Sequence, residues 1–200
     1  DVNGLTKRMT GKLTFGTAGI RSRMEGGLSS LNDLTILQIT NGFAKYINKA
    51  LPKDKWSIVI GYDGRHNSAR WSKLAANVFI KHGIKVFMFS AVTPTPVVSY
   101  GVIKLKTGAG LMMTASHNPK TDNGYKAYWS NGAQIIGPHD VEICKEAEND
   151  PIPKEEYWDT TGLESNPLYD SADVIIDSYF NDEKSLVFHK EENKSCPIKF

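Results

Sequence analysis

This sequence has few cysteines, no long apolar run and no run of four or five basic residues. No apolar stretch approaches the roughly 18 residues that a membrane-spanning helix needs, and the first residues lack the apolar segment of a signal peptide. The two cysteines, Cys144 and Cys196, lie far apart and outside any C-x-x-C spacing, which argues against a disulfide framework and against a zinc site. We therefore expect a cytoplasmic protein with reduced cysteines and no membrane contact.

What the chain does contain is typical of a globular protein with an apolar core. Hydrophobic residues make up 40% of its 200 residues, and charged residues make up 23%. This length fits either one large domain or one domain followed by the beginning of a second.

The net charge of +2 conceals an uneven distribution. Residues 1–132 hold 18 lysines and arginines against 6 aspartates and glutamates, whereas residues 133–200 hold 6 against 16. A basic first part indicates an anionic partner, which leaves nucleic acid, a phosphate-bearing small molecule and the chain's own acidic end as candidates. The basic residues are dispersed and carry no aromatic RNA-binding signature, so we expect a compact phosphate compound and no nucleic acid.

The hydrophobic pattern alternates between short β-branched runs and helical stripes. Strands are predicted over residues 57–62, 84–89 and 109–115, and helices over residues 33–51, 68–82, 97–105 and 138–148. Asn32 or Asp33 can cap the first of these helices, and Asn67 or Ser68 can cap the second. Because parallel strands need a crossover connection, strands separated by helices predict parallel βαβ units.

Beyond the third predicted strand the pattern changes. Asn131-Gly132 separates the apolar runs 125–129 and 133–136, which predicts a hairpin that adds an antiparallel element to the sheet. Residues 172–186 contain enough apolar side chains for a closing helix, and residues 196–200 are expected to start another strand.

Three loops follow the carboxyl ends of the predicted strands, where ligands bind in open α/β sheets. They contain Asp63-Gly64-Arg65, Thr93-Pro94-Thr95-Pro96 and Thr114-Ala115-Ser116-His117-Asn118-Pro119. We expect a hydroxyl, an imidazole, a carboxylate and a guanidinium to converge there. Asp63 and Arg65 form either a structural ion pair or part of the site itself.

Ser116 is the strongest candidate in these loops, because a serine that leaves a buried strand suits a covalent carrier if a neighbour activates it. The alternative is an ordinary turn serine. His117 is suited either to exchanging a proton near neutral pH or to orienting the loop and binding a phosphate oxygen. Lys126 is suited to stabilising charge or, with a lowered pKa, to acting as a base, unless it is an exposed strand lysine.

A small-residue segment, Phe15-Gly16-Thr17-Ala18-Gly19-Ile20-Arg21, precedes all of these loops. Its glycines allow backbone N–H groups to approach an anion, and the guanidinium of Arg21 fits phosphate oxygens. The segment is neither a Walker loop nor a G-x-G-x-x-G motif.

Taken together, these motifs resemble the α-D-phosphohexomutase superfamily. Residues 114–119, continued by Asp122-Asn123-Gly124-Tyr125-Lys126, resemble its phosphoserine loop, and residues 15–21, 61–65 and 93–96 occur in the family's order. Within the superfamily, residues 15–19 and 125–132 are similar to the phosphoglucomutase-2 and phosphopentomutase branch, whose relatives include glucose-1,6-bisphosphate synthase.

The resemblance implies a fold and a domain division. Residues 1–190 are expected to form domain I of the superfamily, a three-layer α/β/α sandwich around a mostly parallel mixed sheet. Residues 191–200 are expected to be a linker and the first strand of domain II.

The resemblance also implies a reaction and roles for the candidate residues. Ser116 would carry a phosphoryl group and exchange it with a sugar phosphate through a bisphosphate, so that phosphate moves between C1 and C6 of a hexose or C1 and C5 of a pentose. Arg21 and Lys126 would neutralise charge and assist proton movement, and either His117 or Lys126 would be the base. The residues expected to bind substrate or phosphate are Arg21, Arg65, Ser116, His117, Asn118 and Lys126.

The implied cofactor is Mg²⁺, held by the phosphate on Ser116 together with three aspartates of domain II that this sequence lacks. The implied partners are glucose 1- and 6-phosphate, ribose or deoxyribose 1- and 5-phosphate, glucose 1,6-bisphosphate, and domains II–IV of a longer chain. We therefore expect these 200 residues alone not to complete turnover. Two other functions stay open: glucose-1,6-bisphosphate synthesis, and phosphosugar binding without catalysis.

Overall fold

A computed structural model of the chain describes residues 2–16 and 19–198, and within them six strands form one mixed sheet in the order β1-β5-β4-β2-β3-β6. The strands are β1 (Ile20–Arg23), β2 (Ser57–Tyr62), β3 (Lys85–Met88), β4 (Ala109–Met113), β5 (Asp122–Trp129) and β6 (Tyr169–Ser171). The neighbours from β4 to β6 run parallel, whereas β5 is antiparallel to both β4 and β1.

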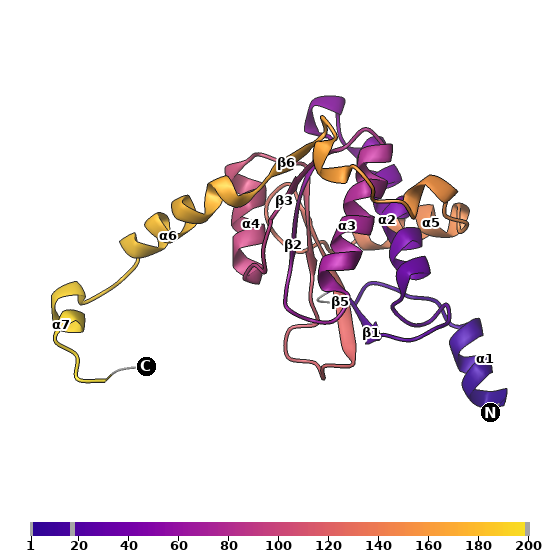
Figure 1. Cartoon of the computed structure of the whole chain (residues 1–200), viewed down its shortest axis with the longest axis horizontal. Helices are drawn as coiled ribbons and strands as arrows, with labels where there is room; N and C mark the ends of the chain where they lie inside the picture. Colours follow the sequence, from indigo (N-terminus) through magenta and orange to yellow (C-terminus); the bar gives the residue numbers. More distant parts are fainter. Residues whose placement is uncertain (1, 17–18, 199–200) are drawn as a thin grey trace.

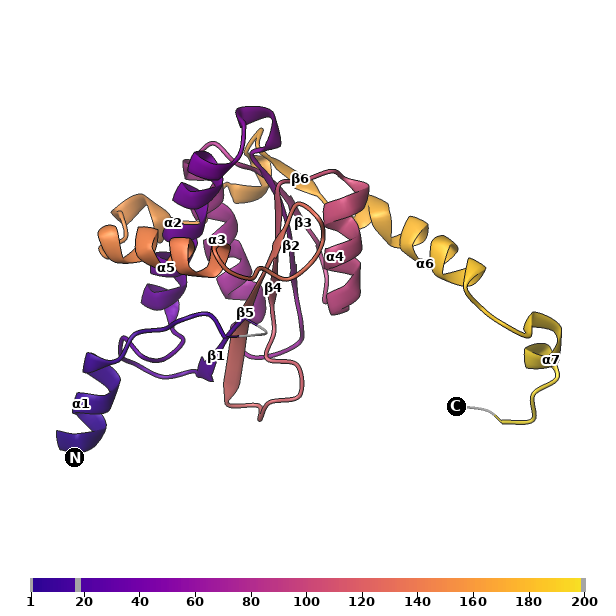
Figure 2. The same ribbon diagram turned by 180° about the vertical axis from the view of Figure 1, so that it is seen from behind.

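Helices lie on both faces of this sheet, and α1 and α7 project away from it (Figure 1). The helices of the described residues are α1 (Val2–Thr10), α2 (Asp33–Ala50), α3 (Ser68–Lys81), α4 (Thr95–Lys104), α5 (His139–Asn149), α6 (Ile176–Ser185) and α7 (Lys190–Lys194), with short 3-10 turns η1 (Lys53–Lys55), η2 (Glu155–Tyr157), η3 (Leu163–Ser165) and η4 (Asp173–Ile175). Figures 1 and 2 show α2, α3 and α5 on one side of the sheet and α4 on the other. The predicted three-layer α/β/α sandwich with a mostly parallel mixed sheet is therefore confirmed.

Two apolar layers hold these elements together. On the side of α2 and α3, the rings of Phe43 and Phe79 meet edge to face with their centroids 5.7 Å apart, within the larger core cluster. On the side of α4, Val98 and Val102 pack in a smaller cluster that also contains Tyr128 of β5. The predicted strands are buried because they lie between these two layers, as their uninterrupted apolar composition requires.

The helix starts follow the sequence to different degrees. Asn32 caps α2 as predicted, because its Oδ1 accepts from the Thr35 N–H at 3.1 Å while Thr35 Oγ1 accepts from the Asn32 N–H at 3.0 Å. Asn67 stands at the N-cap position of α3 but makes no side-chain cap, since its φ of 66° lies in the left-handed region. Ser68 instead donates its hydroxyl to Asp63 Oδ1 at 2.8 Å.

The predicted hairpin is only partly correct. β5 begins at Asp122 rather than at residue 125, and residues 133–136 do not form a strand. They make two backbone hydrogen bonds with the end of β5, from the Trp129 N–H to the Ala133 carbonyl and from the Ile135 N–H to the Ala127 carbonyl. The first half of β5 pairs instead with β1, which takes the edge of the sheet.

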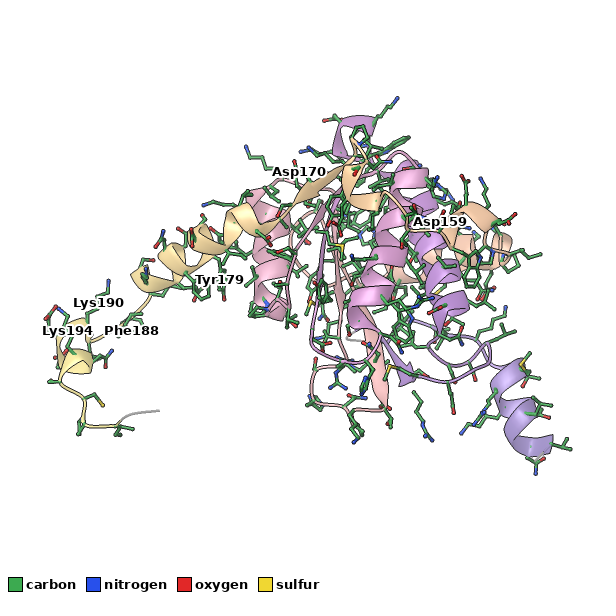
Figure 3. The ribbon with its side chains drawn as sticks, viewed as in Figure 1. Asp159, Asp170, Tyr179, Phe188, Lys190 and Lys194 are labelled. Atoms are coloured by element: carbon green, nitrogen blue, oxygen red, sulfur yellow. The ribbon has the colours of Figure 1, made fainter. Side chains whose placement is uncertain are left out.

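The closing helix predicted over residues 172–186 is divided into η4 and α6. The aromatic rings of Tyr179 on α6 and Tyr100 on α4 contact each other edge to face at 5.3 Å, which attaches the start of α6 to the body. Beyond it the chain extends outward, and Figure 3 shows Phe188, Lys190 and Lys194 at the far end of this arm.

The strand expected over residues 196–200 is not found in its described part, because residues 196–198 have no regular structure, and residues 199–200 lie outside the described residues. The domain boundary near residue 190 stays a prediction. Every helix within residues 2–16 and 19–198 is too short or too polar to cross a membrane.

Candidate active site

Ser116 lies in the loop between β4 and β5 and is exposed. Its φ of 55° falls in the left-handed region, which costs a residue with a side chain about 1 kcal/mol or more. Its backbone is held from both sides, because its N–H donates to Thr114 Oγ1 at 2.9 Å and its carbonyl accepts from Arg65 Nη2 at 2.6 Å. The nucleophile candidate is thus presented to solvent in a strained and firmly held conformation.

Lys126 on β5 supplies the partner of the Ser116 hydroxyl. Its Nζ donates to Ser116 Oγ at 2.7 Å, and the residue is only 6% exposed. Burial lowers the pKa of Lys126, the positive charge of Arg21 lowers it further, and Asp63 acts in the opposite direction. A lysine with a lowered pKa in contact with a serine hydroxyl is suited to give or take the proton of that hydroxyl.

Arg21 approaches the same face of the sheet from β1. Arg21 stands opposite Gly124 in the antiparallel pairing of β1 and β5. Its side chain therefore lies on the same face of the sheet as that of Lys126, two residues after Gly124. Its Nε is buried and has no hydrogen-bond partner among the described residues. A buried guanidinium nitrogen without a partner is an unsatisfied donor, which an anionic group would satisfy.

The close approach of this segment to β5 depends on Gly19. Its φ of +91° is unfavourable for other residues, and a Cβ there would lie 2.6 Å from the Tyr125 carbonyl oxygen. The proposed anion-binding segment 15–21 is only partly visible, since residues 17–18 lie outside the described residues.

Arg65, from the loop after β2, is turned toward the Ser116 loop but is fully engaged there. Its two Nη atoms donate to four backbone carbonyls, and its Nε lies 3.3 Å from Asp63 Oδ2. The ion pair with Asp63, one of the two alternatives left by the sequence, is present. Direct phosphate binding by Arg65 stays a prediction.

His117 and Asn118 follow Ser116, but neither side chain forms a hydrogen bond with its hydroxyl among the described residues. The His117 side chain is exposed and forms no hydrogen bond or ion pair within residues 2–16 and 19–198. Asn118 Nδ2 donates to Asp122 Oδ2 at 3.1 Å, which closes the loop on itself. Of the two candidate bases, the structure brings Lys126 to Ser116.

The third loop, residues 93–96, joins the site only indirectly. The Thr93 N–H donates to the Tyr62 carbonyl at 2.9 Å, and Pro94 is the N-cap of α4. No hydrogen bond connects residues 93–96 with residues 114–119 in the described part of the chain. Two of the three predicted loops therefore converge.

A cleft of about 420 Å³ opens beside Ser116. Its lining residues come from the loops after β2 and β4, and they are Asp63, Gly64, Arg65, His66, Ser116, Asn118 and Lys120. His66 and Lys120 add two exposed basic groups that the sequence interpretation did not select, although both stand next to selected motifs. Thr114 was also missed, and a threonine two residues before a turn serine is the signal that could have identified it.

The carboxylates of this site do not make a metal centre. Within residues 2–16 and 19–198, no three His, Cys, Asp or Glu side chains are grouped as metal ligands. The carboxylate of Asp63 already accepts from the Arg65 N–H at 3.1 Å and from Ser68 Oγ, and it pairs with Arg65 Nε. A Mg²⁺ ion on a phosphorylated Ser116 would therefore need carboxylates from outside the described residues.

Comparison with known proteins identifies the family of this chain. Residues 12–152 match the family model described as phosphoglucomutase/phosphomannomutase, alpha/beta/alpha domain I. The chain is 45% identical over 204 residues to the phosphopentomutase of Homo sapiens, covering 98% of this chain and 33% of that protein. It is 42% identical over 214 residues to the glucose 1,6-bisphosphate synthase of Homo sapiens, covering 99% and 34%. The chain thus spans about a third of the length of these curated relatives.

A solved structure shows the same fold. A protein from Thermus thermophilus, provisionally named a phosphomannomutase, superposes with a TM-score of 0.73 at 23% identity, covering 90% of this chain and 37% of that one.

Proposed function

Residues 12–152 place this chain in the phosphoglucomutase/phosphomannomutase family through its domain I, and from that membership we propose that it is the phosphoserine domain of a phosphosugar mutase. The observation that carries the proposal is the contact of 2.7 Å between Lys126 Nζ and the exposed Ser116 Oγ. The serine hydroxyl lies on a strained loop and accepts a hydrogen bond from a buried lysine, and an arginine nitrogen without a partner among the described residues lies on the same face of the sheet. Such an arrangement suits phosphoryl transfer.

The first half-reaction starts from phosphorylated Ser116. The bond between phosphorus and Ser116 Oγ breaks, and a bond forms from phosphorus to a hydroxyl oxygen of the sugar phosphate. Lys126 gives its proton to Ser116 Oγ, while the sugar hydroxyl loses its proton to a base. The product is a sugar bisphosphate and a free Ser116 hydroxyl.

The second half-reaction restores the enzyme. Ser116 Oγ attacks the other phosphate of the bisphosphate and gives its proton to Lys126, and the released sugar oxygen takes back the proton that the base held. The phosphate has then moved between C1 and C6 of a hexose or between C1 and C5 of a pentose. Each step needs positive charge near the transferring group, which Arg21 and Lys126 supply.

We assign the proton at Ser116 Oγ to Lys126 and not to His117. Lys126 is in contact with the hydroxyl and has a lowered pKa, whereas His117 is exposed and forms no hydrogen bond with that hydroxyl among the described residues. His117 and Asn118 are then available to the sugar phosphate that enters from the solvent side.

The substrate proposal rests on the named relatives. The greater identity to a phosphopentomutase, 45% against 42%, favours ribose or deoxyribose 1- and 5-phosphate, with glucose phosphates as further substrates. Glucose 1,6-bisphosphate synthesis is the second candidate, and the 42% identity to such a synthase is what favours it. Net bisphosphate formation from glucose 1-phosphate with 1,3-bisphosphoglycerate as donor distinguishes the synthase from the mutase.

Magnesium remains part of the proposal but not of any step derived from this chain. In such a reaction a divalent ion neutralises phosphate charge, and the described residues do not hold one by themselves. We therefore expect turnover only from the full-length protein, with the further domains that the family comparison implies, and none from these 200 residues alone.

The test is the intact mass of the full-length protein before and after incubation with a sugar phosphate. We expect one phosphate on the protein as purified, its loss on incubation, and its absence in Ser116→Ala. Ser130→Ala, in the exposed turn after β5, is the matched control and should keep the phosphate. A protein that never carries phosphate under any of these conditions contradicts the proposal.

A further inference from the structure

The guanidinium of Arg65 occupies the centre of the Ser116 loop. Its side chain is 14% exposed. Its acceptors in this loop are the backbone carbonyls of Ser116 at 2.6 Å, Asn118 at 2.8 Å, Pro119 at 2.8 Å and Asp122 at 3.1 Å. Each Nη atom therefore donates to two carbonyls, and Nε lies 3.3 Å from Asp63 Oδ2 in an ion pair.

Four carbonyl oxygens that point to one place would repel one another without a cation between them. The Pro119 carbonyl also accepts from the Asp122 N–H, whereas the carbonyls of Ser116 and Asn118 have no other donor among the described residues. A guanidinium suits this position because its planar fork offers several donors in fixed directions, whereas an ammonium group offers only three. The loop from Ser116 to Asp122 is thus wrapped around Arg65.

Asp63 and its partners fix the orientation of the guanidinium. Asp63 Oδ1 accepts from Ser68 Oγ at 2.8 Å, and Ser68 Oγ accepts from Asn123 Nδ2 at 2.9 Å. Asn123 is fully buried and belongs to β5, the strand that also carries Lys126. The network of Asp63, Ser68 and Asn123 therefore connects the arginine that holds the Ser116 loop to β5, the strand that carries Lys126.

We propose that Arg65 is a positioning residue, which holds Ser116 in the left-handed conformation that brings its Oγ to Lys126 Nζ, and that it does not bind the sugar phosphate. This inference rests on the proposed phosphoryl transfer at Ser116, and it replaces the sequence-based expectation that Arg65 binds phosphate. A phosphate could take a donor from Arg65 only by removing one from a loop carbonyl.

The experiment compares Arg65→Gln, Arg65→Lys and wild type in the full-length protein, with kcat and KM for the sugar phosphate measured separately. A misplaced nucleophile reduces the rate of transfer, so we expect Arg65→Gln to lower kcat by about a hundredfold while KM stays unchanged. The kcat of Arg65→Lys should fall in the same way, because lysine keeps the positive charge but lacks the planar guanidinium with its several N–H donors. Added guanidinium should restore part of the kcat of an Arg65→Ala variant.

Arg70→Lys is the matched control. Arg70 is an arginine of α3, outside the cleft, whose side chain is 60% exposed and pairs with Asp33. We expect wild-type kcat and KM from it. If thermal unfolding shows that Arg65→Gln does not fold, Asp63→Asn replaces it in the experiment. This variant disturbs the orientation of Arg65, so it should lower kcat less than Arg65→Gln would and leave KM unchanged.

The outcomes are distinguishable. A large rise in KM that Arg65→Lys largely repairs means that Arg65 binds substrate by its charge, and it overturns the inference, as do unchanged kinetics. A wild-type protein that shows neither Ser116 phosphate nor isomerisation overturns the proposed function itself. Loss of kcat with constant KM and rescue by guanidinium supports the positioning role.

Discussion

Two polar clusters on opposite faces of the sheet differ in how their groups are paired. On the face of α2 and α3, His82 Nε2 lies 2.9 Å from Asn41 Oδ1 and 3.0 Å from the Tyr157 hydroxyl. On the face of α4, Arg21 Nε is buried without a partner among the described residues, and Ser116 is held at a φ of 55°. Unpaired groups alone do not mark a site, since Asn48 Oδ1 of α2 and Ser72 Oγ of α3 are also buried without a partner in the described part of the chain. The face of α4 differs because an unpaired guanidinium nitrogen occurs there together with backbone strain at the exposed Ser116.

The largest expected effect on the cluster at the face of α4 comes from replacing Lys126. We expect Lys126→Met in the full-length protein to lower kcat by roughly 10² to 10⁴, because the proton at Ser116 Oγ loses its carrier. Steady-state isomerisation measures this, with circular dichroism as the check on folding. A variant with wild-type kcat would show that Lys126 is a buried strand lysine without a role in the reaction.

Replacing Arg21 should change both kcat and the pH dependence of the rate. Arg21→Met should lower kcat by about 10² or more, since one preorganised donor at the transferring group is lost. It should also raise the pKa of Lys126, because Arg21 disfavours the protonated lysine. The limb of the pH–rate profile that requires protonated Lys126, which gives its proton in the first half-reaction, should therefore move to higher pH. Movement to lower pH contradicts the assignment.

Asn41 tests the other cluster. Asn41→Ala removes the acceptor that the half-buried His82 and the buried Tyr157 share, and we expect the free energy of unfolding to fall by about 2 kcal/mol. Urea unfolding of the 200-residue chain measures this. In the full-length protein kcat should be unchanged, and a specific loss of kcat without loss of stability would assign this cluster to the site.

The smallest expected effect is the pH dependence of stability from His82. Burial lowers the pKa of His82, with the charges of Lys154 and Lys45 adding to it. The unfolded chain then binds more protons, so stability is full above the unfolded pKa of about 6.5 and falls as the pH drops below it. Burial also lowers the pKa of His139, which contributes in the same direction.

Urea unfolding at several pH values, with His82→Gln for comparison, isolates the part that belongs to His82. The variant should lose less stability than wild type between neutral and mildly acidic pH. An equal loss in both proteins would exclude His82 as the source.

The central strands were predictable because burial on both faces imposes an apolar composition. β2 was predicted at its observed bounds, and β3 and β4 within a few residues. β1 and β6 were missed, since Ile20–Arg23 is largely polar and Tyr169–Ser171 is short and only partly buried. Edge strands of this kind owe their structure to the neighbour with which they pair.

The site was predictable in its residues but not in their pairing. The motif around Ser116 selected Lys126, whereas the choice between His117 and Lys126 required the distance to Ser116 Oγ. The position of Arg65 depends on carbonyls that lie more than fifty residues along the chain. Local sequence carries no information on where a backbone oxygen will point.

The most direct test of this account is the location of phosphate by peptide mapping. The full-length protein is incubated with glucose 1,6-bisphosphate, digested and analysed by tandem mass spectrometry, then chased with ribose 5-phosphate. The account predicts a single phosphate on Ser116 that disappears during the chase as sugar bisphosphate forms. A phosphate on another residue, or one on Ser116 that the sugar phosphate cannot remove, would contradict it.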